Sequence, residues 1–360
     1  MASSSRKPRV GSKSNIMFTN AVYFPNHSVY AGHTPAQLNY SCINLVYYAF
    51  AMVTADGHVL LSDSDVDLRL PCDGADGALE SLMHLKDQHP HLTVVLSVGG
   101  GDSASIFPVV ASDPVRRNNF AVSISTIIKT SEWLDGVDLH WVYPSTAEMA
   151  ADFLALLAEV RMHLADDRYL LTAVLPANKP VLQLFDLVQV AACVDLINLA
   201  AYDFYGSWSP RCGHHAQLYA LNKDEPSGAS AVHYLMSHGV PSKKILFGVP
   251  LYGRSFLNTS GPGHRFNGVG GAANMDGIFE YRELPRPGTK EQVDRRVVGA
   301  QCVGGDGGFV SYDNPETVET KVEFCRQKSL SGLYYWSSPS DVQDHKRSLV
   351  SVGFRALHGG

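Results

Sequence analysis

The chain has 360 residues, of which 45% are hydrophobic and 18% charged, and a formal net charge of −6. This apolar content supports a large folded core and excludes a disordered chain. The small acidic excess without a basic stripe disfavours nucleic acid as a partner, and no stretch reaches the ~20 apolar residues needed to cross a membrane.

The N-terminal segment 1–18 begins with charged and serine residues and lacks the apolar run of a signal peptide, which predicts a flexible basic tail. Three N-x-S/T sequons, at Asn26, Asn39 and Asn258, favour secretion. We therefore expect an extracellular location, with a cytoplasmic one as the alternative. The six cysteines form no CxxC pair, so zinc and redox motifs are disfavoured, and both buried thiols and disulfides stay open.

Short β-branched and apolar runs alternate with helical patterns along the chain. The predicted strands are 20–25, 43–53, 93–98, 134–143, 169–175, 194–202, 244–251 and 331–337. The predicted helices are 77–88, 114–130, 146–165, 179–191, 229–238, 314–328 and 341–355. Strands that are apolar almost throughout are typical of parallel sheets covered on both faces.

Eight strands alternating with helices predict an α/β fold, a (β/α)8 TIM barrel. A Gly-rich stretch before 314–328 predicts a small α+β insertion between strands 7 and 8. The expected domains are a tail at 1–18, a barrel formed by 19–256 and 313–355, and an insertion at 257–312. A doubly wound open sheet is the rival architecture. Gly261–Gly271 resembles a phosphate loop only weakly, because no strand and long helix flank it.

Functional residues of such a barrel lie at the C-terminal ends of its strands, and the fourth strand is the most informative. Side chains alternate along a strand, so Asp138, His140 and Val142 share one face. Taken alone, a buried Asp or His in a barrel is often a hydrogen-bonded core group.

Five motifs, in order at matching strand ends, resemble glycoside hydrolase family 18, the chitinases, and the resemblance covers Asn20 to about residue 350. The fourth strand is similar to D-x-x-D-x-D-x-E of that family. The other motifs are Ser97–Gly100 for S-x-G-G, Tyr202-Asp203 for M-x-Y-D, Pro250–Phe256 for the strand-seven motif and Trp336 for the strand-eight tryptophan. The family also carries an α+β insertion between strands 7 and 8.

The fourth-strand motif is altered at two positions. Asp135 and Asp138 are kept, whereas the third Asp is His140 and the terminal Glu, which is the family's general acid, is Val142. Glycosidic cleavage needs a proton on the leaving oxygen, and this family uses the substrate's acetamido group as nucleophile. Val142 has no titratable group, and His140 is no carboxylate beside a developing cation. We therefore expect no catalytic residues and a protein that is not an enzyme.

The resemblance implies that the sugar-contacting residues are retained. They are Tyr23, Trp208, Tyr202, Asp203, Tyr252, Arg254 and Trp336. Aromatic faces stack on pyranose rings, while polar groups fix their orientation. His27 and Gly101 stand where the family often carries further aromatics, and Ala200 and Tyr334 replace two methionines. We expect a reshaped cleft of lower affinity. Simple packing of these aromatics under loops is the structural alternative.

The leading hypothesis is a catalytically inactive, chitinase-like monomer that binds chitin or N-acetylglucosamine oligomers without a cofactor. The first strand and Ser62–Pro71 resemble fungal members, which suggests a secreted fungal effector that sequesters chitin fragments from host immune receptors. One alternative is an interaction or inhibitor-type homologue without sugar binding, and another is a hydrolase with altered or residual activity.

Other chemistry is disfavoured by the sequence. Glu148 follows the fourth strand, where it is expected to face solvent rather than to replace the missing acid. A metal site built from Asp138, His140 and Asp203 lacks further clustered ligands, so no metal is expected. The His214-His215 pair stands in a Gly-flanked loop and is expected to be solvated.

Overall fold

The computed structural model describes residues 17–164, 168–271, 276–305 and 307–359. Eight parallel strands form a closed barrel, because β1 pairs with β2 on one side and with β16 on the other. The barrel strands are β1 (Thr19–Pro25), β2 (Leu45–Val53), β6 (Thr93–Gly99), β7 (Gly136–His140), β8 (Leu170–Pro176), β9 (Leu196–Ala200), β10 (Ile245–Pro250) and β16 (Gly332–Trp336). The predicted (β/α)8 barrel is confirmed, and the doubly wound open sheet is excluded.

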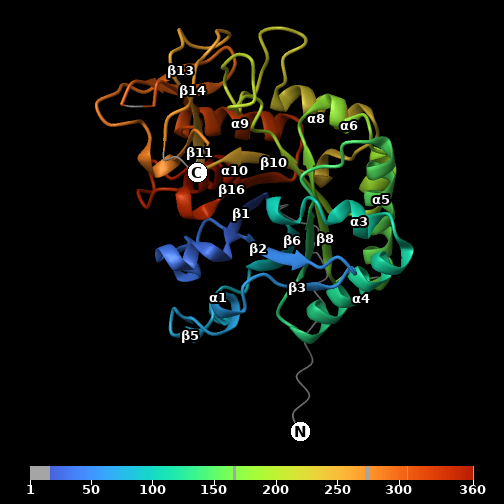
Figure 1. Cartoon of the computed structure of the whole chain (residues 1–360). Coiled ribbons are helices and arrows are strands. Elements are labelled where there is room, and N and C mark those ends of the chain that lie inside the picture. Colours follow the sequence, from blue (N-terminus) through green and yellow to red (C-terminus); the bar gives the residue numbers. More distant parts are fainter. Residues whose placement is uncertain (1–16, 165–167, 272–275, 306, 360) are drawn as a thin grey trace.

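Helices surround the barrel on its outside (Figure 1). They are α1 (Ser64–Leu68), α2 (Ala78–Gln88), α3 (Phe107–Ala111), α4 (Pro114–Thr130), α5 (Ala147–His163), α6 (Lys179–Leu182), α7 (Leu187–Cys193), α8 (Gly228–Ser237), α9 (Pro315–Gln327) and α10 (Leu349–His358). Side-chain caps define several of their starts: the side chain of Asp113 caps α4, and that of Thr146 accepts from the Met149 N–H of α5. No helix within the described ranges is long and apolar enough to span a bilayer.

Two of the predicted helices differ from the structure. The segment 179–191 forms two helices, α6 and α7, because Asp186 caps a new start by accepting from the Gln189 N–H. The helix predicted over 341–355 begins only at Leu349, where Ser348 is the cap. Asp341 instead accepts bonds from the N–H groups of Leu349 and Val350 and holds the preceding loop.

Apolar side chains on the outer face of the barrel pack against the helices. Trp141, just after β7, is 1% exposed and stacks on Phe107 of α3, with Phe153 of α5 at its edge. The inner face is different, because large aromatics such as Tyr23, Tyr47 and Tyr334 fill it together with polar side chains. The barrel is therefore a packed interior whose polar groups lie among tyrosines.

A second, antiparallel sheet follows β10. Its strands are β11 (Tyr252–Phe256), β12 (Ile278–Glu280), β13 (Gln292–Asp294), β14 (Gly299–Val303) and β15 (Phe309–Tyr312), in the order β12-β11-β15-β14-β13. Strand β11 starts two residues after β10 ends, so this sheet begins at the C-terminal end of the barrel. Three short strands, β3 (Val59–Leu61), β4 (Pro71–Cys72) and β5 (Ala75–Asp76), lie nearer the N-terminus. All six cysteines are free thiols.

Candidate functional site

Asp138 on β7 is the centre of a buried polar cluster inside the barrel. Its Oδ2 accepts hydrogen bonds from the hydroxyls of Tyr23 (2.8 Å) and Ser97 (2.7 Å). Its Oδ1 accepts from Thr172 Oγ1 (2.7 Å) and Asn198 Nδ2 (3.3 Å). Burial raises the pKa of Asp138, and the hydroxyl donors lower it in part. Four barrel strands besides β7 thus converge on one carboxyl group.

His140 lies one step further along the same face of β7, and its side chain is enclosed by aromatic rings. Its Nδ1 is 3.9 Å from Asp138 Oδ2, and the ring is 6% exposed. The ring centroids of Tyr23, Phe50 and Trp336 lie 5.3, 5.0 and 5.5 Å from that of His140. Burial lowers the pKa of His140 to about 3. The imidazole is therefore neutral at physiological pH.

The two ends of β7 carry very different side chains. Val142 lies just past the C-terminal end and is 39% exposed, so an aliphatic side chain faces solvent there. Asp135 lies at the opposite end, where it pairs with Lys86 and accepts from the backbone N–H of Val94 (2.7 Å). Asp135 is therefore a structural group that lies away from the candidate site.

A second polar cluster surrounds Asp203, which follows β9. Its Oδ1 accepts from Tyr252 Oη (2.7 Å) and Arg254 Nε (2.6 Å), and His215 Nδ1 lies 3.5 Å away. Burial opposes ionisation of Asp203, but His215 and Arg254 outweigh it and hold the pKa of this carboxyl well below its usual range. Asp203 therefore stays ionised and fixes the two side chains that β11 contributes.

Trp208 covers this cluster from outside. The Arg254 guanidinium carbon lies 4.5 Å from the Trp208 ring centroid, which is a cation–π contact. A Cβ on Gly206 would lie 2.3 Å from the indole, so the ring folds back over the loop only because residue 206 is glycine. The indole is nevertheless 58% exposed. It offers an apolar face to solvent beside an arginine whose Nη1 has no hydrogen-bond partner within the described part of the chain.

Four half-buried aromatic side chains lie at the C-terminal ends of barrel strands and pack on one interior cluster. We call them the aromatic patch, and they are Phe50, Tyr143, Tyr202 and Trp336. Phe50 and Trp336 stack with ring centroids 5.7 Å apart and an interplanar angle of 26°. Tyr202 Oη lies 3.2 Å from Tyr334 Oη. Phe50 and Trp336 of the patch also contact the His140 ring.

The predicted sugar-contacting residues fall into two groups. Trp336, Tyr202 and Trp208 have accessible surface, whereas Tyr23 is fully buried and uses its hydroxyl on Asp138. Tyr252 and Arg254 are also buried, at 7% and 6% exposure, against the partly exposed Asp203. They lie behind the accessible surface and hold it in place.

Sequence reasoning missed Phe50, Tyr143 and His215. The first two stand at or just after predicted strands, and that position at a barrel's C-terminal end is the signal that could have identified them. His215 was expected to be solvated together with His214, and this was wrong, because they are 0% and 3% exposed. Glu148 is exposed as predicted. No three His, Cys, Asp or Glu side chains in the described ranges are arranged to hold a metal.

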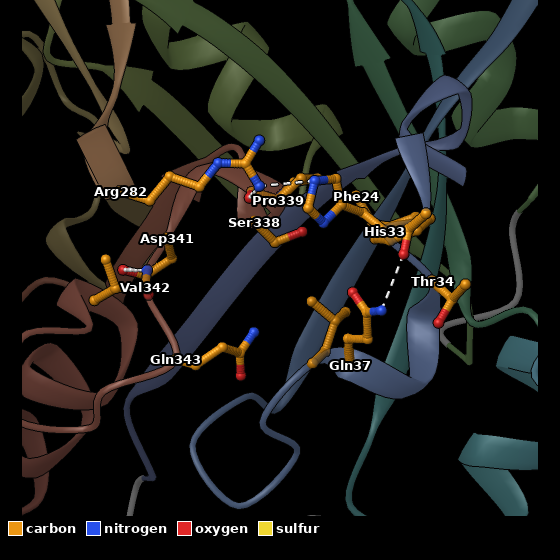
Figure 2. A pocket seen from close by; sticks show the side chains of 12 residues that line it. Phe24, His33, Thr34, Gln37, Arg282, Ser338, Pro339, Asp341, Val342 and Gln343 are labelled. Atoms are coloured by element: carbon orange, nitrogen blue, oxygen red, sulfur yellow. Dashed lines mark hydrogen bonds between the residues drawn. The ribbon is translucent and has the colours of Figure 1, made fainter. Parts of the chain in front are cut away.

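A separate cavity of about 610 Å³ lies between the loops that follow β1 and β16 (Figure 2). Arg282 Nη1 donates to His33 Nε2 (2.7 Å) at one side of it. Figure 2 shows the side chains of Gln37 and Gln343 on opposite sides of the open space. Phe24, which also lines it, is the neighbour of the inward-facing Tyr23 on β1. Nothing in the sequence pattern predicts this cavity.

Comparisons with known proteins agree on one family. The model of the glycosyl hydrolases of family 18 matches residues 19–341. Chitinase 1 of Aphanocladium album is 34% identical to this chain, and the match covers 94% of this chain and 85% of that protein. Endochitinase 1 of Metarhizium robertsii is 36% identical, and the match covers 95% of this chain and 86% of that protein. The Group IV chitinase of Ostrinia furnacalis superimposes with a TM-score of 0.85, at 25% identity over 94% of this chain and 99% of that one. A family-18 chitinase of Cycas revoluta, solved as a mutant with (GlcNAc)4, superimposes with a TM-score of 0.79 at 26% identity, and the match covers 93% of this chain and 98% of that one.

These comparisons contradict the expectation that the protein is not an enzyme. That expectation rests on two positions, His140 and Val142, whereas relatives that match nearly the whole chain are named as chitinases. The conclusion of inactivity is therefore withdrawn. Family model, whole-length relatives and barrel all lead to the same assignment: the chain belongs to the glycosyl hydrolases of family 18.

Proposed function

We propose that this protein binds oligomers of N-acetylglucosamine across the aromatic patch. The observation that carries the proposal is the stack of Trp336 on Phe50 above the neutral His140, at the C-terminal end of the barrel. Exposed aromatic faces beside a few fixed polar groups suit pyranose rings with amide substituents. A relative with 26% identity was solved with four such units bound, which supports the same ligand class.

Within this proposal, each predicted residue has a definite task. Trp336, Tyr202 and Trp208 contact the sugar through their accessible faces. Asp203, held by Tyr252 and Arg254, presents its partly exposed carboxylate to acetamido or hydroxyl groups. Tyr23 acts behind the surface by fixing Asp138.

Isothermal titration with oligomers of two to six units tests the proposal. We expect affinity to rise with oligomer length and Trp336→Ala to weaken it about tenfold or more, as the loss of one aromatic platform does. Trp133→Ala is the matched control, because this half-buried tryptophan precedes β7 at the opposite end of the barrel. The absence of heat at millimolar oligomer, or equal losses in both variants, would refute the proposal.

A second candidate function is hydrolysis of the same oligomers. The names of the two fungal relatives, which share 34–36% identity with this chain, favour it. A chromogenic chitobioside assay with mass spectrometry of the products measures it in the same protein samples. Released chromophore and shortened oligomers would support this function, and unchanged oligomers would count against it.

The remaining parts of the proposal concern organisation and location. We propose the division into a barrel (19–256 and 313–355) and an insertion (257–312), whereas most of the predicted tail at 1–18 lies outside the described residues. We also propose a monomer that acts outside the cell and sequesters chitin fragments. Size-exclusion chromatography with light scattering tests the first point, and detection in culture filtrate tests the second.

A further inference from the structure

A cavity of about 860 Å³ lies outside the aromatic patch, between the loop that follows β9 and the turn that joins β13 to β14. Figure 1 shows these segments close together, and the N–H groups of Leu218 (2.9 Å) and Tyr219 (3.1 Å) both donate to Val297 O. The lining residues that matter here are Tyr205, Arg211, His214, Gln217, Gln292 and Gln301. The volume falls within the range typical of ligand sites, ~300–1,000 Å³.

His214 forms part of the cavity wall and has an unused polar atom. The side chain is 3% exposed, and its Nδ1 lies 3.4 Å from Ser311 Oγ, which already accepts from the His215 backbone N–H (3.1 Å). If the Ser311 hydroxyl donates to Nδ1, the ring proton of His214 stands on Nε2. His214 Nε2 has no hydrogen-bond partner in the described ranges. A buried donor without a partner destabilises the fold, so this nitrogen favours a ligand acceptor.

Two of the three arginines at this cavity already have carboxylate partners. Arg295 Nε lies 2.6 Å from Glu316 Oε1, and its Nη2 donates to the second oxygen. Arg296 forms the same two-point contact with Asp294, at 3.0 and 2.7 Å. These pairs leave little free positive charge, which disfavours an anion as the ligand.

The remaining lining groups offer balanced donors and acceptors. Arg211 donates to Gly263 O (2.8 Å) through Nη1, and no ion pair joins it to a carboxylate among the described residues. Glu225 balances this charge, and its carboxylate accepts from the Asn222 side chain. The carboxamide of Gln217 donates through Nε2 to Pro226 O (2.7 Å), and its oxygen has no hydrogen-bond donor among the residues that the structure describes.

We propose that this cavity binds a neutral saccharide unit, separately from the aromatic patch. Arg211 and the Nε2–H of His214 donate to its hydroxyl or acetamido oxygens, and the Gln217 oxygen accepts from its hydroxyls. The half-buried ring of Tyr205 supplies the apolar face that such a ligand needs. Planar amide and guanidinium groups in a site without net charge match a polyhydroxylated neutral molecule better than a phosphate or a carboxylate.

The test uses the Trp336→Ala protein, so that binding at the aromatic patch does not hide the second site. Chitobiose and cellobiose are titrated while the imidazole ¹⁵N signals of His214 are followed by NMR. We expect saturable shifts of the His214 Nε2 signal with at least one of the two disaccharides. Adding Arg211→Ala is expected to weaken this binding about tenfold, because one charge-assisted hydrogen bond is lost.

Arg69→Ala is the matched control, since this exposed arginine caps the C-terminal end of α1, pairs with Asp65 and should leave the shifts unchanged. The proposal is wrong if neither disaccharide shifts His214, if Arg69→Ala and Arg211→Ala act alike, or if phosphate shifts His214 while both sugars do not. A failure of the aromatic patch to bind sugar is recognised separately, because the parent and Trp336→Ala proteins would then have the same oligomer affinity.

Discussion

His140 Nδ1 lies 3.9 Å from Asp138 Oδ2, on the face of β7 that points into the barrel. The carboxylate accepts from four donors on four other barrel strands, so the imidazole stays 3.9 Å away and forms no short ion pair with it. Burial keeps the imidazole uncharged. A neutral ring thus stands where the family motif has its third aspartate.

We predict that Val142→Glu combined with His140→Asp raises hydrolysis of a chromogenic chitobioside. Val142 is 39% exposed just past the end of β7, so a glutamate there is open to solvent at the end of the barrel where the oligomer is proposed to bind. General acid catalysis contributes ~10²–10⁴-fold, and a rate at least about 10²-fold above the parent's is expected. The control, Val142→Gln with His140→Asp, has the same shape without the acid. Equal rates in both double variants would contradict the prediction.

We predict that acidification destabilises the parent more than it destabilises His140→Gln. The pKa of His140 is about 3 in the fold and ~6.5 when unfolded, so the unfolded chain takes up the proton first as pH falls. Its contribution to stability is complete above pH ~6.5 and is lost towards pH 3. From pH 7 to pH 5 the parent should lose ~2 kcal/mol more of its free energy of unfolding than His140→Gln does, as measured by urea unfolding of both proteins at each pH. Parallel pH curves for the two proteins would contradict this.

The barrel could be predicted because its strands are local apolar runs. Each of the eight predicted strands overlaps an observed one, and alternation along β7 correctly placed Asp138 and His140 on one face, which the structure shows to be the inner one. Helix ends were less predictable where a single cap decides them. The hydrogen bond from the Gln189 N–H to Asp186 divides the segment 179–191 into two helices. Hydrophobic periodicity carries no information about that bond, so it predicted one continuous helix.

The clusters around the site were harder to predict because long-range contacts form them. His215 reaches Asp203 since the loop after β9 folds back, with the Phe204 N–H donating to His215 O (3.0 Å). Neither residue spacing nor composition predicts that this loop folds back and brings His215 next to Asp203. The inference of inactivity failed for a different reason, because it extended two side-chain identities, at His140 and Val142, to the whole chain.

We predict that Asp138→Ala strongly destabilises the fold. The substitution leaves buried donors on Tyr23, Ser97 and Thr172 without their acceptor, and each unsatisfied group costs ~1–3 kcal/mol. A loss of ~3 kcal/mol or more is expected in urea unfolding monitored by circular dichroism. Asp65→Ala, which removes an exposed carboxylate on α1, should change stability by less than ~1 kcal/mol. Similar losses in the two variants would show that the Asp138 cluster is not a stabilising network.

We predict that removing one partner of the ion pair between Lys321 and Asp313 lowers the free energy of unfolding more than replacing both partners with apolar residues does. The two side chains are 0% and 1% exposed, and Asp313 also accepts from Thr317 Oγ1 (2.7 Å). Asp313→Ala leaves a buried ammonium without its partner and should cost ~3–5 kcal/mol in urea unfolding. Lys321→Met with Asp313→Leu removes both charges while it keeps the volume, so its loss should be smaller than that of Asp313→Ala alone. A double variant less stable than Asp313→Ala would contradict this prediction and would show that the attraction between the two charges exceeds the cost of burying them.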